Sequence, residues 1–507
     1  MNTTLIKPIV LIVLDGWGIL DERKNNAIAQ ANTPFYDKLW EQYPHSLLDA
    51  SEEKVGLPTG QMGNSEIGHM TIGAGKTIDT DLVRIAKAIK DKTWDTNPAF
   101  TELFDHVKQY NSTLHIQGLV SPGGVHSHSS HLYAFLESAK NAGITNVVIH
   151  AFTDGRDTPP QSAASYLQEL EDVIEKVGIG FIATAAGRFY AMDRDNNWDR
   201  LQKAEDAIFS CKGKICELKK PSEVFQELYK EGVLDEHTEP LVFLDENGKS
   251  YPVQENDGIF FFNFRSDRGR MLSKKIIEKS EEKNLCFVTM TQYNKTFTCR
   301  VAFPPIGIDT TLAAEVSKAG LTQAHIAETE KYPHATYFLN GGKQDPHTGE
   351  EHILIESRKD VQTHDLAPKM RAKEIADKAL EQLEQKTDFI FINFANADMV
   401  GHTANQPAIL EAVEEVDRQL QRVVEATHIQ NGVVFITADH GNAEVMIDPV
   451  TGEKHTAHTT NLVPGILTDT TYTLRESGTL ADITPTILSL FNIKQPESMT
   501  GANLLIS

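Results

Sequence analysis

Aspartate and histidine side chains recur directly after apolar, strand-like segments of this chain, where they could bind metal ions. They are, in chain order, Asp15, Asp398, His402, Asp439 and His440, and the polar loop KHTAHTTN adds His458. Open α/β sheets bind ligands at the carboxyl ends of their strands, so these groups could converge. Oxygen and imidazole donors without a thiolate suit manganese, zinc or magnesium. Together the carboxylates and imidazoles are enough to hold two divalent ions.

Taken singly, each of these residues has a simpler interpretation. An aspartate after a strand is more often a turn or helix-cap residue than a metal ligand. A single histidine is more often a surface residue or a hydrogen-bonded core residue, and we interpret His455, in the same loop as His458, in this way. The recurrence of aspartate after separate strands, with histidine nearby, favours a shared metal site.

A glycine-rich segment supplies one candidate nucleophile. The stretch GLPTGQMGNSEIGHMTIGAG, residues 56–75, contains Ser65 among its glycines. Ser65 could begin a short helix whose N-terminal amides would stabilise a phosphate on its oxygen, or it could merely cap that helix. Beside two metal ions we favour the nucleophile, because a metal lowers the pKa of a bound hydroxyl. The segment lacks the pattern G-x-x-x-x-G-K-[ST], so ATP binding is not implied.

The middle of the chain carries a second, largely cationic set of residues after its strands. The guanidinium group of arginine binds carboxylate and phosphate through two parallel hydrogen bonds. Several arginines at one sheet edge of an acidic chain therefore predict a small anionic substrate that carries several negative charges. Surface ion pairs with neighbours such as Asp193, Asp195 and Asp267 are the alternative, and we expect no role for Arg270. The set is His126, Arg156, Asp157, Arg188, Arg194, Arg265 and Arg268.

Short β-branched runs alternate with helical patterns, which predicts βαβ units and an α/β fold. Several runs are almost wholly apolar, as in strands of a parallel sheet that is covered on both faces. The clearest helix spans 408–427, where apolar residues recur at spacings of three and four, and others are predicted at 162–177 and 369–385. The predicted strands are 9–14, 113–120, 146–152, 179–185, 258–264, 285–290, 388–394 and 432–437.

A length of 507 residues favours two or three domains. The glycine-rich stretch 73–80 precedes a new helical pattern, and 293–309 contains prolines and reads as an extended connector. We therefore predict a metal-binding domain formed by residues 1–79 and 306–507, with a substrate-binding domain, residues 80–305, inserted into it.

The amino-acid composition argues against some classes of binding partner. Forty-eight basic residues against 71 acidic ones give a formal charge of −23, which argues against nucleic acid and anionic membranes but not against a small anion bound by local arginines. No C-x-x-C pair is present among the four cysteines, which favours reduced thiols. No apolar run is long enough for a signal or a membrane span. We expect a soluble cytoplasmic monomer that binds a small molecule.

Several spaced motifs together resemble the cofactor-independent phosphoglycerate mutases, which act without 2,3-bisphosphoglycerate. The motifs extend from Asp15 to His458 and so cover nearly the whole chain. Ile67, where similar sequences often have valine, is a conservative departure. The motifs are VLDGWG, LPTGQMGNSEIGH, GGVHSH, TDGRDTPP, GRFYAMDRD, FNFRSDRGR, TEKYPHATYFLNGG and TADHGN.

The resemblance implies an alkaline-phosphatase-like sheet domain formed by both chain ends, with an inserted phosphotransferase domain. It implies interconversion of 2- and 3-phosphoglycerate in glycolysis and gluconeogenesis, with two manganese ions, although the same ligands accept other divalent metals. By similarity, one ion would be held by Asp15, Ser65, Asp439 and His440, and the other by Asp398, His402 and His458. The substrate would be bound by His126, Arg156, Asp157, Arg188, Arg194, Arg265, Arg268 and Lys331.

These residues are consistent with transfer through a phosphoserine. Ser65 would attack the phosphorus in line, with the leaving oxygen stabilised by Lys331 or a neighbouring cation. Glycerate would then reorient, and its other hydroxyl would attack phospho-Ser65 with Asp157 as the base. Water that reached phospho-Ser65 first would cause hydrolysis, so we expect the domains to close about the two connectors.

Two other classes of function are open at this point. A metal-dependent phosphohydrolase, or a mutase of phosphorylated sugars with a similar metal domain, would explain the metal ligands and Ser65 but not the arginines. A non-catalytic anion-binding protein would lack a ligand or the nucleophile, and none is missing here. Isomerisation of phosphoglycerate measured against phosphate release separates the two kinds of enzyme.

Overall fold

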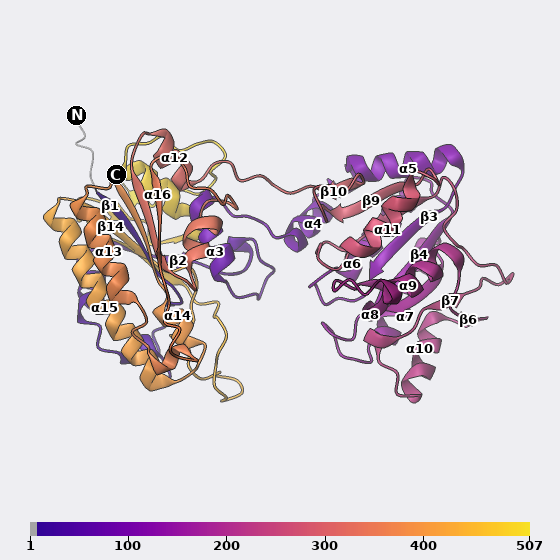
Figure 1. Cartoon of the computed structure of the whole chain (residues 1–507), viewed down its shortest axis with the longest axis horizontal. Helices are drawn as coiled ribbons and strands as arrows, with labels where there is room; N and C mark the ends of the chain where they lie inside the picture. The colour runs from indigo at the N-terminus through magenta and orange to yellow at the C-terminus, as the bar shows by residue number, and fades with distance from the viewer. Residues whose placement is uncertain (1–7, 218, 507) are drawn as a thin grey trace. The chain divides into compact units, whose positions relative to one another are not determined.

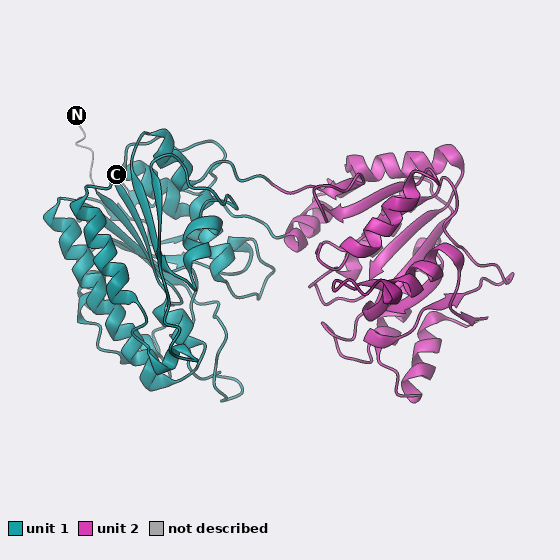
Figure 2. Cartoon of the chain, in the orientation of Figure 1, with its two compact units in different colours: residues 1–80, 307–507 teal, residues 81–306 magenta. Residues whose placement is uncertain are grey.

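The structure is a computed structural model that describes residues 8–217 and 219–506 (Figure 1). The chain divides into two compact units, with residues 1–80 and 307–507 in unit 1 and residues 81–306 in unit 2 (Figure 2). Each unit is built around an eight-stranded sheet with helices. The predicted α/β class is confirmed.

The sheet of unit 1 is mainly parallel. Its central strand β1 (Ile9–Leu14) pairs in parallel with β13 (Phe389–Phe394) on one side and with β14 (Val433–Thr437) on the other. Strand β15 is antiparallel to both of its neighbours, β14 and β2, whereas β17 pairs in parallel with β2. The order is β12 (Glu350–Ile355), β11 (Gln323–Glu328), β13, β1, β14, β15 (Val463–Leu467), β2 (His45–Asp49) and β17 (Ser477–Thr479).

Helices cover both faces of this sheet (Figure 1). On one face α13 (Ala372–Glu384) packs on α15 (Gln406–Ile429), which α1 (Ala27–Gln30), α2 (Pro34–Gln42) and α14 (Asn396–Gly401) also contact. On the other face α3 (Ser65–Ala74), α12 (Leu312–Lys318) and α16 (Ile483–Leu490) contact one another. A two-stranded ribbon of β16 (Thr473–Leu474) and β18 (Leu505–Ile506) completes the unit.

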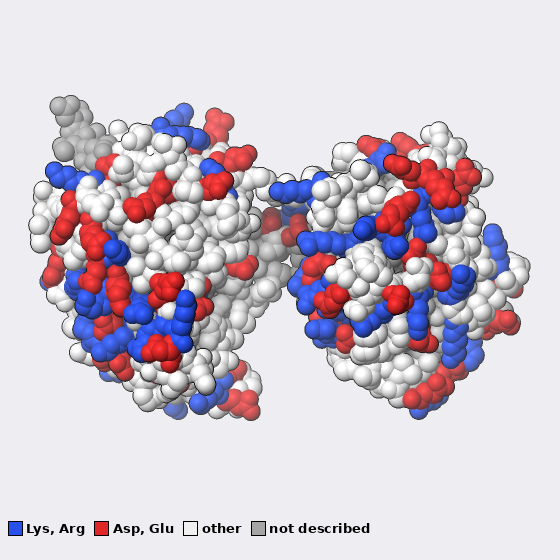
Figure 3. Space-filling view, in the orientation of Figure 1, with Lys and Arg blue, Asp and Glu red and all other residues white. Residues whose placement is uncertain are grey.

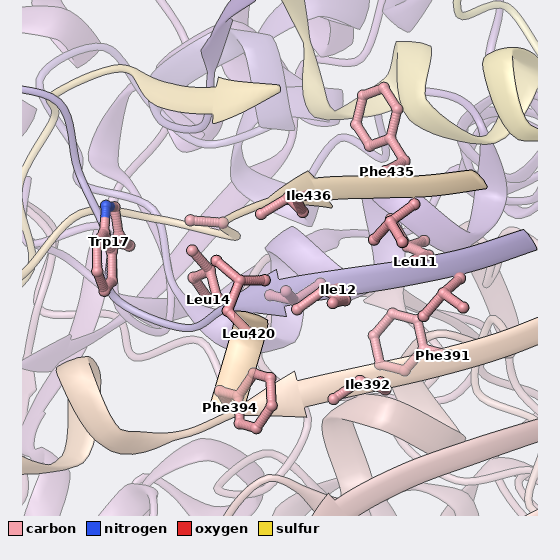
Figure 4. Packing of buried hydrophobic residues seen from close by; sticks show 14 of the residues in the cluster. Leu11, Ile12, Leu14, Trp17, Phe391, Ile392, Phe394, Leu420, Phe435 and Ile436 are labelled. Atoms are coloured by element: carbon pink, nitrogen blue, oxygen red, sulfur yellow. The ribbon is translucent and has the colours of Figure 1, made fainter. Parts of the chain in front are cut away.

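The three central strands are apolar at nearly every position because both faces of the sheet are covered. All residues of β1 are buried, and Leu11 and Ile12 lie between the side chains of β13 and β14 (Figure 4). Burial of one such side chain stabilises the fold by about 1.5–3 kcal/mol. This packing fixes the strand ends, and with them the residues that follow.

The sheet of unit 2 is also mainly parallel, with β7 antiparallel to β5. The central pair is β3 and β4, whose register runs from Leu114 opposite Val147 to Leu119 opposite Phe152. The order is β10 (Arg300–Phe303), β9 (Cys286–Thr291), β8 (Gly258–Phe261), β3 (Leu114–Leu119), β4 (Val147–Thr153), β5 (Ile182–Gly187), β7 (Leu241–Phe243) and β6 (Lys214–Cys216).

Two hydrophobic cores in unit 2 correspond to two groups of helices. One core includes residues of α4 (Asp81–Lys90), α5 (Pro98–Tyr110), α6 (Ser129–Asn141), α7 (Ala163–Val177) and α10 (Pro221–Lys230). The other includes residues of α8 (Arg188–Ala191), α9 (Trp198–Ser210) and α11 (Arg270–Ser280). Both cores draw on the sheet, which is therefore covered on both faces.

The predicted strands and helices are present to within a few residues, but two connector predictions need correction. Gly73 belongs to α3 and not to a loop, where a Cβ would collide with the carbonyl of Leu339. The stretch 293–309 is not extended connector throughout, because it contains β10, which pairs with β9. Both corrections shorten the segments that join the units.

Two surface properties bear on possible partners. Among the described residues, no helix combines the length and the apolar character needed to cross a membrane. On the face shown in Figure 3, acidic and basic side chains are interspersed over both units.

Candidate active site

Three aspartates come together at the carboxyl ends of neighbouring strands in unit 1. Asp15 follows β1, Asp398 lies in α14 after β13, and Asp439 follows β14. The turn after β1 passes very close to α14, because a Cβ on Gly16 would lie 2.6 Å from the Cα of Asp398, and Gly16 has a φ of +77°. Only glycine readily takes this backbone conformation, so the turn depends on it.

The first predicted group of ligands is a triangle of donor atoms. His402 Nε2, His458 Nε2 and Asp398 Oδ1 are each 3.2 Å from the other two. Donors on a tetrahedral ion with bonds of about 2 Å are separated by about 3.3 Å, so the triangle fits a metal of this kind. Nδ1 of His402 lies 2.7 Å from the carbonyl of Thr456, and Nδ1 of His458 lies 2.8 Å from that of Gly63. Donation at Nδ1 leaves both Nε2 lone pairs facing the triangle.

The other predicted group consists of Asp15, Ser65, Asp439 and His440. All four are buried, the aspartates and His440 completely. His440 Nε2 is 3.5 Å from Asp15 Oδ1 and 3.5 Å from Asp439 Oδ2. Oδ2 of Asp439 is buried and makes no well-directed hydrogen bond with the described residues, although ring nitrogens of His69 and His440 lie 3.3 and 3.5 Å from it. A buried carboxylate oxygen without a donor is costly unless a cation binds it, so this donor set also fits a divalent ion.

Ser65 is the first residue of α3, and its side chain faces both groups. Its Oγ lies 3.0 Å from His440 Nε2 and 3.4 Å from Asp15 Oδ1. The cap of α3 is Asn64, whose side chain accepts from the amide of Ile67, so the interpretation of Ser65 as a mere cap is wrong. Its hydroxyl remains available for chemistry.

Lys331 supplies the cation of this region. Its Nζ lies 2.7 Å from Asp15 Oδ1, 2.6 Å from Asp398 Oδ2 and 2.6 Å from Ser65 Oγ. Burial opposes the charged form, but Asp15 and Asp398 raise the pKa of Lys331 above its usual value. Sequence analysis placed Lys331 with the substrate ligands, and the structure places it between the two groups of metal ligands and in contact with Ser65.

The carboxylates of this cluster ionise unequally. Burial and then the neighbouring Asp439 raise the pKa of Asp15. Burial opposes ionisation of Asp398 as well, but Lys331 and the two imidazoles hold the pKa of Asp398 well below its usual range. A cluster with more carboxylates than cations becomes easier to ionise when further positive charge is bound.

Sequence analysis missed the side chains that orient these groups. Asn393 donates to Asp15 Oδ2 at 2.8 Å, and Asn442 donates to Asp398 Oδ1 at 3.0 Å. His69 lies with Nδ1 2.9 Å from the carbonyl of Ser65 and 3.3 Å from Asp439 Oδ2. Signals were present, since His69 follows Ser65 by one helical turn and Asn393 interrupts the apolar strand FINF.

The cationic set lies at the carboxyl ends of strands in unit 2, and Asp267 joins part of it. Asp267 pairs with Arg194 at 2.9 Å and with Arg265 at 3.1 Å, and His126 Nδ1 lies 3.6 Å away. These two arginines therefore form ion pairs with Asp267, as the alternative expected. Asp193 instead pairs with Arg200. Arg194 and Arg265 are 43% and 48% exposed, so they could exchange Asp267 for a bound anion.

Arg188 is the buried arginine of the set. Its Nη1 lies 2.7 Å from Asp154 Oδ1 and 2.5 Å from Asp157 Oδ2. Asp154, which was not among the predicted residues, also accepts from Ser121 Oγ and from the amide of Asp157. Asp154 thus positions both Arg188 and Asp157.

Arg268 and Arg156 are the remaining arginines of the cationic set, and their surroundings favour the binding of an anion. Burial and then the positive charges of Arg188, Arg194 and Arg156 lower the pKa of Arg268. Among the described residues, the ion-pair partner of Arg156 is Glu236, at 3.5 Å. A multiply charged anion would relieve this repulsion.

His126 is the imidazole of the cationic set. Its Nε2 lies 3.9 Å from Asp157 Oδ2. Burial and then Arg188 lower the pKa of His126 to about 4. The ring is therefore neutral at pH 7, and it can donate or accept one hydrogen bond without adding charge.

Comparisons with known proteins agree with this geometry. The sequence model described as Metalloenzyme superfamily matches residues 7–495. A 2,3-bisphosphoglycerate-independent phosphoglycerate mutase of Francisella philomiragia is 45% identical over 98% of this chain and 99% of its own. One of Moorella thermoacetica is 46% identical over the whole of both chains.

A solved structure shows the same relation. The phosphoglycerate mutase of Leishmania mexicana, crystallised at low cobalt concentration, superposes with a TM-score of 0.61 and 28% identity over 100% of this chain and 99% of its own. The resemblance drawn from the motifs is confirmed. The chain belongs to the Metalloenzyme superfamily and, within it, to the family of 2,3-bisphosphoglycerate-independent phosphoglycerate mutases.

Proposed function

We propose that this chain interconverts 2- and 3-phosphoglycerate without 2,3-bisphosphoglycerate, by way of a phosphorylated Ser65. One observation carries the proposal: the Ser65 hydroxyl lies 2.6 Å from Lys331 Nζ and 3.0 Å from His440 Nε2, beside two groups of residues with the chemistry of metal ligands. The names of the Francisella and Moorella relatives support the substrate.

We assign two manganese ions to the site, with zinc or cobalt as ions that the same donors accept. Asp15, Ser65, Asp439 and His440 would hold one ion, and Asp398, His402 and His458 the other. When bound, the ions supply positive charge to the Ser65 oxygen and to the oxygens of the transferring phosphoryl group. Asn393, Asn442 and His69 orient the protein ligands through the hydrogen bonds described above.

In the first transfer, the Ser65 oxygen attacks the phosphorus of bound phosphoglycerate, and the bond from phosphorus to the glycerate oxygen breaks. Lys331 lies beside Ser65 Oγ, where its ammonium stabilises the charge that develops on the reacting oxygens. The start of α3 presents backbone amides to a phosphate on Ser65. These interactions are stronger in the transition state than in the ground state, as catalysis requires.

In the second transfer, the other hydroxyl of glycerate attacks phospho-Ser65. The arginine set and His126 hold the carboxylate and phosphate groups, and Asp157 takes the proton of the attacking hydroxyl. Asp157 is held in place by Arg188 at 2.5 Å. Exclusion of water from phospho-Ser65 favours isomerisation over hydrolysis.

We also propose that unit 1 is the metal-binding domain and unit 2 the substrate-binding domain of a cytoplasmic monomer. The donor groups lie in unit 1 and the arginines in unit 2. The four cysteines form no disulfide, in keeping with a reducing compartment.

The test is an assay of the purified protein with 3-phosphoglycerate and manganese, without bisphosphoglycerate. We expect 2-phosphoglycerate as the main product, with little free phosphate. Release of phosphate without isomerisation would instead identify a phosphohydrolase, and the absence of both products would contradict an enzyme of either kind.

A further inference from the structure

Glu444 is a buried carboxylate beside the candidate metal site, and it belongs to neither group of predicted ligands. It is 0% exposed and lies in the loop that follows β14, shortly after His440. A buried charge is costly unless it is paired or fully hydrogen-bonded. The partners of Glu444 therefore indicate why a carboxylate is placed here.

Four donors surround the Glu444 carboxylate, two at each oxygen. Oε2 accepts from the backbone amide of Asn442 at 2.8 Å and from that of Gly18 at 3.1 Å. Oε1 accepts from the side-chain amide of Asn461 at 2.9 Å and from the hydroxyl of Thr459. An ionised carboxylate has about four acceptor sites, so these donors occupy them and leave none for a metal ion.

The donors come from three separate segments of unit 1. Gly18 lies in the turn after β1, Asn442 in the loop after β14, and Thr459 in the loop before β15. The segments approach one another tightly, because a Cβ on Gly18 or Gly441 would collide with the Glu444 carboxylate. One side chain therefore joins three segments that have no other element in common.

The loop before β15 supplies one predicted metal ligand and orients another. His458 directly precedes Thr459, and the carbonyl of Thr456 lies 2.7 Å from Nδ1 of His402. The hydrogen bonds that Glu444 accepts from this loop therefore fasten the part of the chain that holds both imidazoles of the first ligand group.

Asp398, the carboxylate of that first group, is reached through Asn442. The side chain of Asn442 donates to Asp398 Oδ1 at 3.0 Å, while its backbone amide donates to Glu444 Oε2. Glu444 thus holds the surroundings of all three ligands of the first group, although it contacts none of them in a hydrogen bond.

The other ligand group has supports that do not involve Glu444. Asn393 donates to Asp15 Oδ2 at 2.8 Å, and His69 Nδ1 lies 3.3 Å from Asp439 Oδ2. Both contacts would remain if the Glu444 carboxylate were removed. Its removal should therefore affect the two ligand groups unequally.

We propose that Glu444 is a positioning residue that sets the metal affinity of the first ligand group, an inference that rests on the proposed binding of two ions by unit 1. It acts through Asn442 on Asp398 and through the loop before β15 on the two imidazoles. Loss of such contacts around metal ligands typically lowers metal affinity by about 10- to 100-fold.

Calorimetric titration with manganese tests this role without reliance on catalysis. In Glu444→Ala, one of the two manganese equivalents should bind roughly 10- to 100-fold more weakly, while the other binds as in the wild type. The matched control is Glu415→Ala, because Glu415 is a 7% exposed carboxylate of the same unit that accepts from Arg418 and Gln419. This control should keep both affinities.

Two milder variants make the test independent of how well Glu444→Ala folds. In Glu444→Gln the amide oxygen can still accept from the two backbone amides, and the Thr459 hydroxyl and the Asn461 side chain can turn to accept from the new amide group. This variant should recover most of the lost affinity. Thr459→Val removes a single donor and should weaken the same manganese equivalent by a smaller factor.

The outcomes separate this role from the proposed function. Equal manganese affinities in the wild type, Glu444→Ala and Thr459→Val would overturn the role of Glu444 and leave the proposed metal site intact. Equal weakening of both ions would overturn it as well, since Glu444 would then serve only the stability of unit 1. A wild-type protein that binds no manganese would contradict the metal site itself and this role with it.

Discussion

In unit 1 the carboxyl ends of β1, β13 and β14 present carboxylates and imidazoles, whereas in unit 2 the carboxyl ends of β4, β5 and β8 lead into guanidinium groups. Both sheets are mainly parallel, so in each case the strand ends converge. The position of each site therefore follows from the topology, and its charge follows from the residues placed there.

The two sites also differ in how their charges are compensated. In unit 1 Lys331 is buried with Asp15, Asp398 and Asp439 around it. Binding of further cations would therefore stabilise this site. In unit 2 several guanidinium groups form ion pairs with Asp267, Asp154 and Asp157. Binding of an anion would therefore stabilise that site further. Four predictions test this division, from the largest expected effect to the smallest.

The variant Ser65→Ala should lose turnover by at least roughly 10⁴-fold, because it removes the nucleophile while the metal ligands remain. Steady-state isomerisation and metal content, measured on the same preparation, check this. The control is Ser51→Ala, a serine of unit 1 that is 6% exposed, as Ser65 is. Near wild-type turnover in Ser65→Ala would remove the basis of the proposed mechanism.

The variant Lys331→Met should destabilise the metal-free protein by about 3–5 kcal/mol, since it leaves buried carboxylates without their cation. Added manganese should raise the melting temperature of this variant more than that of the wild type, because the ions replace the lost charge. Thermal unfolding with and without manganese measures both effects. Lys369→Met, at a side chain that is 59% exposed, serves as control, and identical behaviour of the two variants would contradict the prediction.

Unit 2 should become less stable in acid because of His131. Burial, with a smaller contribution from His128, lowers the pKa of His131 to about 3, whereas the unfolded chain takes up that proton near pH 6.5. The stabilisation is therefore present above pH 6.5 and is lost as pH falls toward 3, with about 3 kcal/mol lost by pH 4.

The variant His131→Leu should lack this part of the pH dependence. Hydrogen exchange of the α6 amides, corrected for intrinsic rates, reports on unit 2 directly. His237→Leu, at an exposed site in the same unit, should follow the wild type. An unchanged slope in His131→Leu would assign the acid sensitivity to other groups.

The variant Arg268→Gln should raise KM for phosphoglycerate by roughly 10- to 100-fold, the loss expected for about 1.5–3 kcal/mol of charge-assisted hydrogen bonding. Metal content should not change, because the arginines and the metal ligands belong to different units. Arg270→Gln is the control, since Arg270 donates to the carbonyl of Tyr293 and stands outside the set. A loss of metal in Arg268→Gln would contradict the proposal that unit 1 binds the metal ions and unit 2 the substrate.

Much of the fold was predictable because the central strands are apolar on both faces. The runs before Asp15, Asp398 and Asp439 are strands to within one residue of the predicted bounds. Polar residues that follow such runs must lie at the sheet edge, so these predicted ligands came together as expected.

What the sequence did not reveal depends on strands of mixed polarity and on contacts across strands. Strand β12, EEHILI, is the edge strand of the sheet, and β11, QAHIAE, lies next to it. Both strands mix polar with apolar residues, so they were not predicted. Their register alone brings His325 beside His352. Asn393 was missed for a related reason, since its hydrogen bond to Asp15 crosses from β13 to the end of β1.

The central claim is that Ser65 carries the phosphoryl group between the two positions of glycerate. Wild-type enzyme mixed with phosphoglycerate labelled in its phosphate, quenched in acid within a turnover and digested into peptides, tests this directly. We predict the label on the peptide that contains Ser65, and its loss when unlabelled glycerate is added before the quench. Label on another residue, or rapid turnover with no labelled peptide at all, would contradict the account.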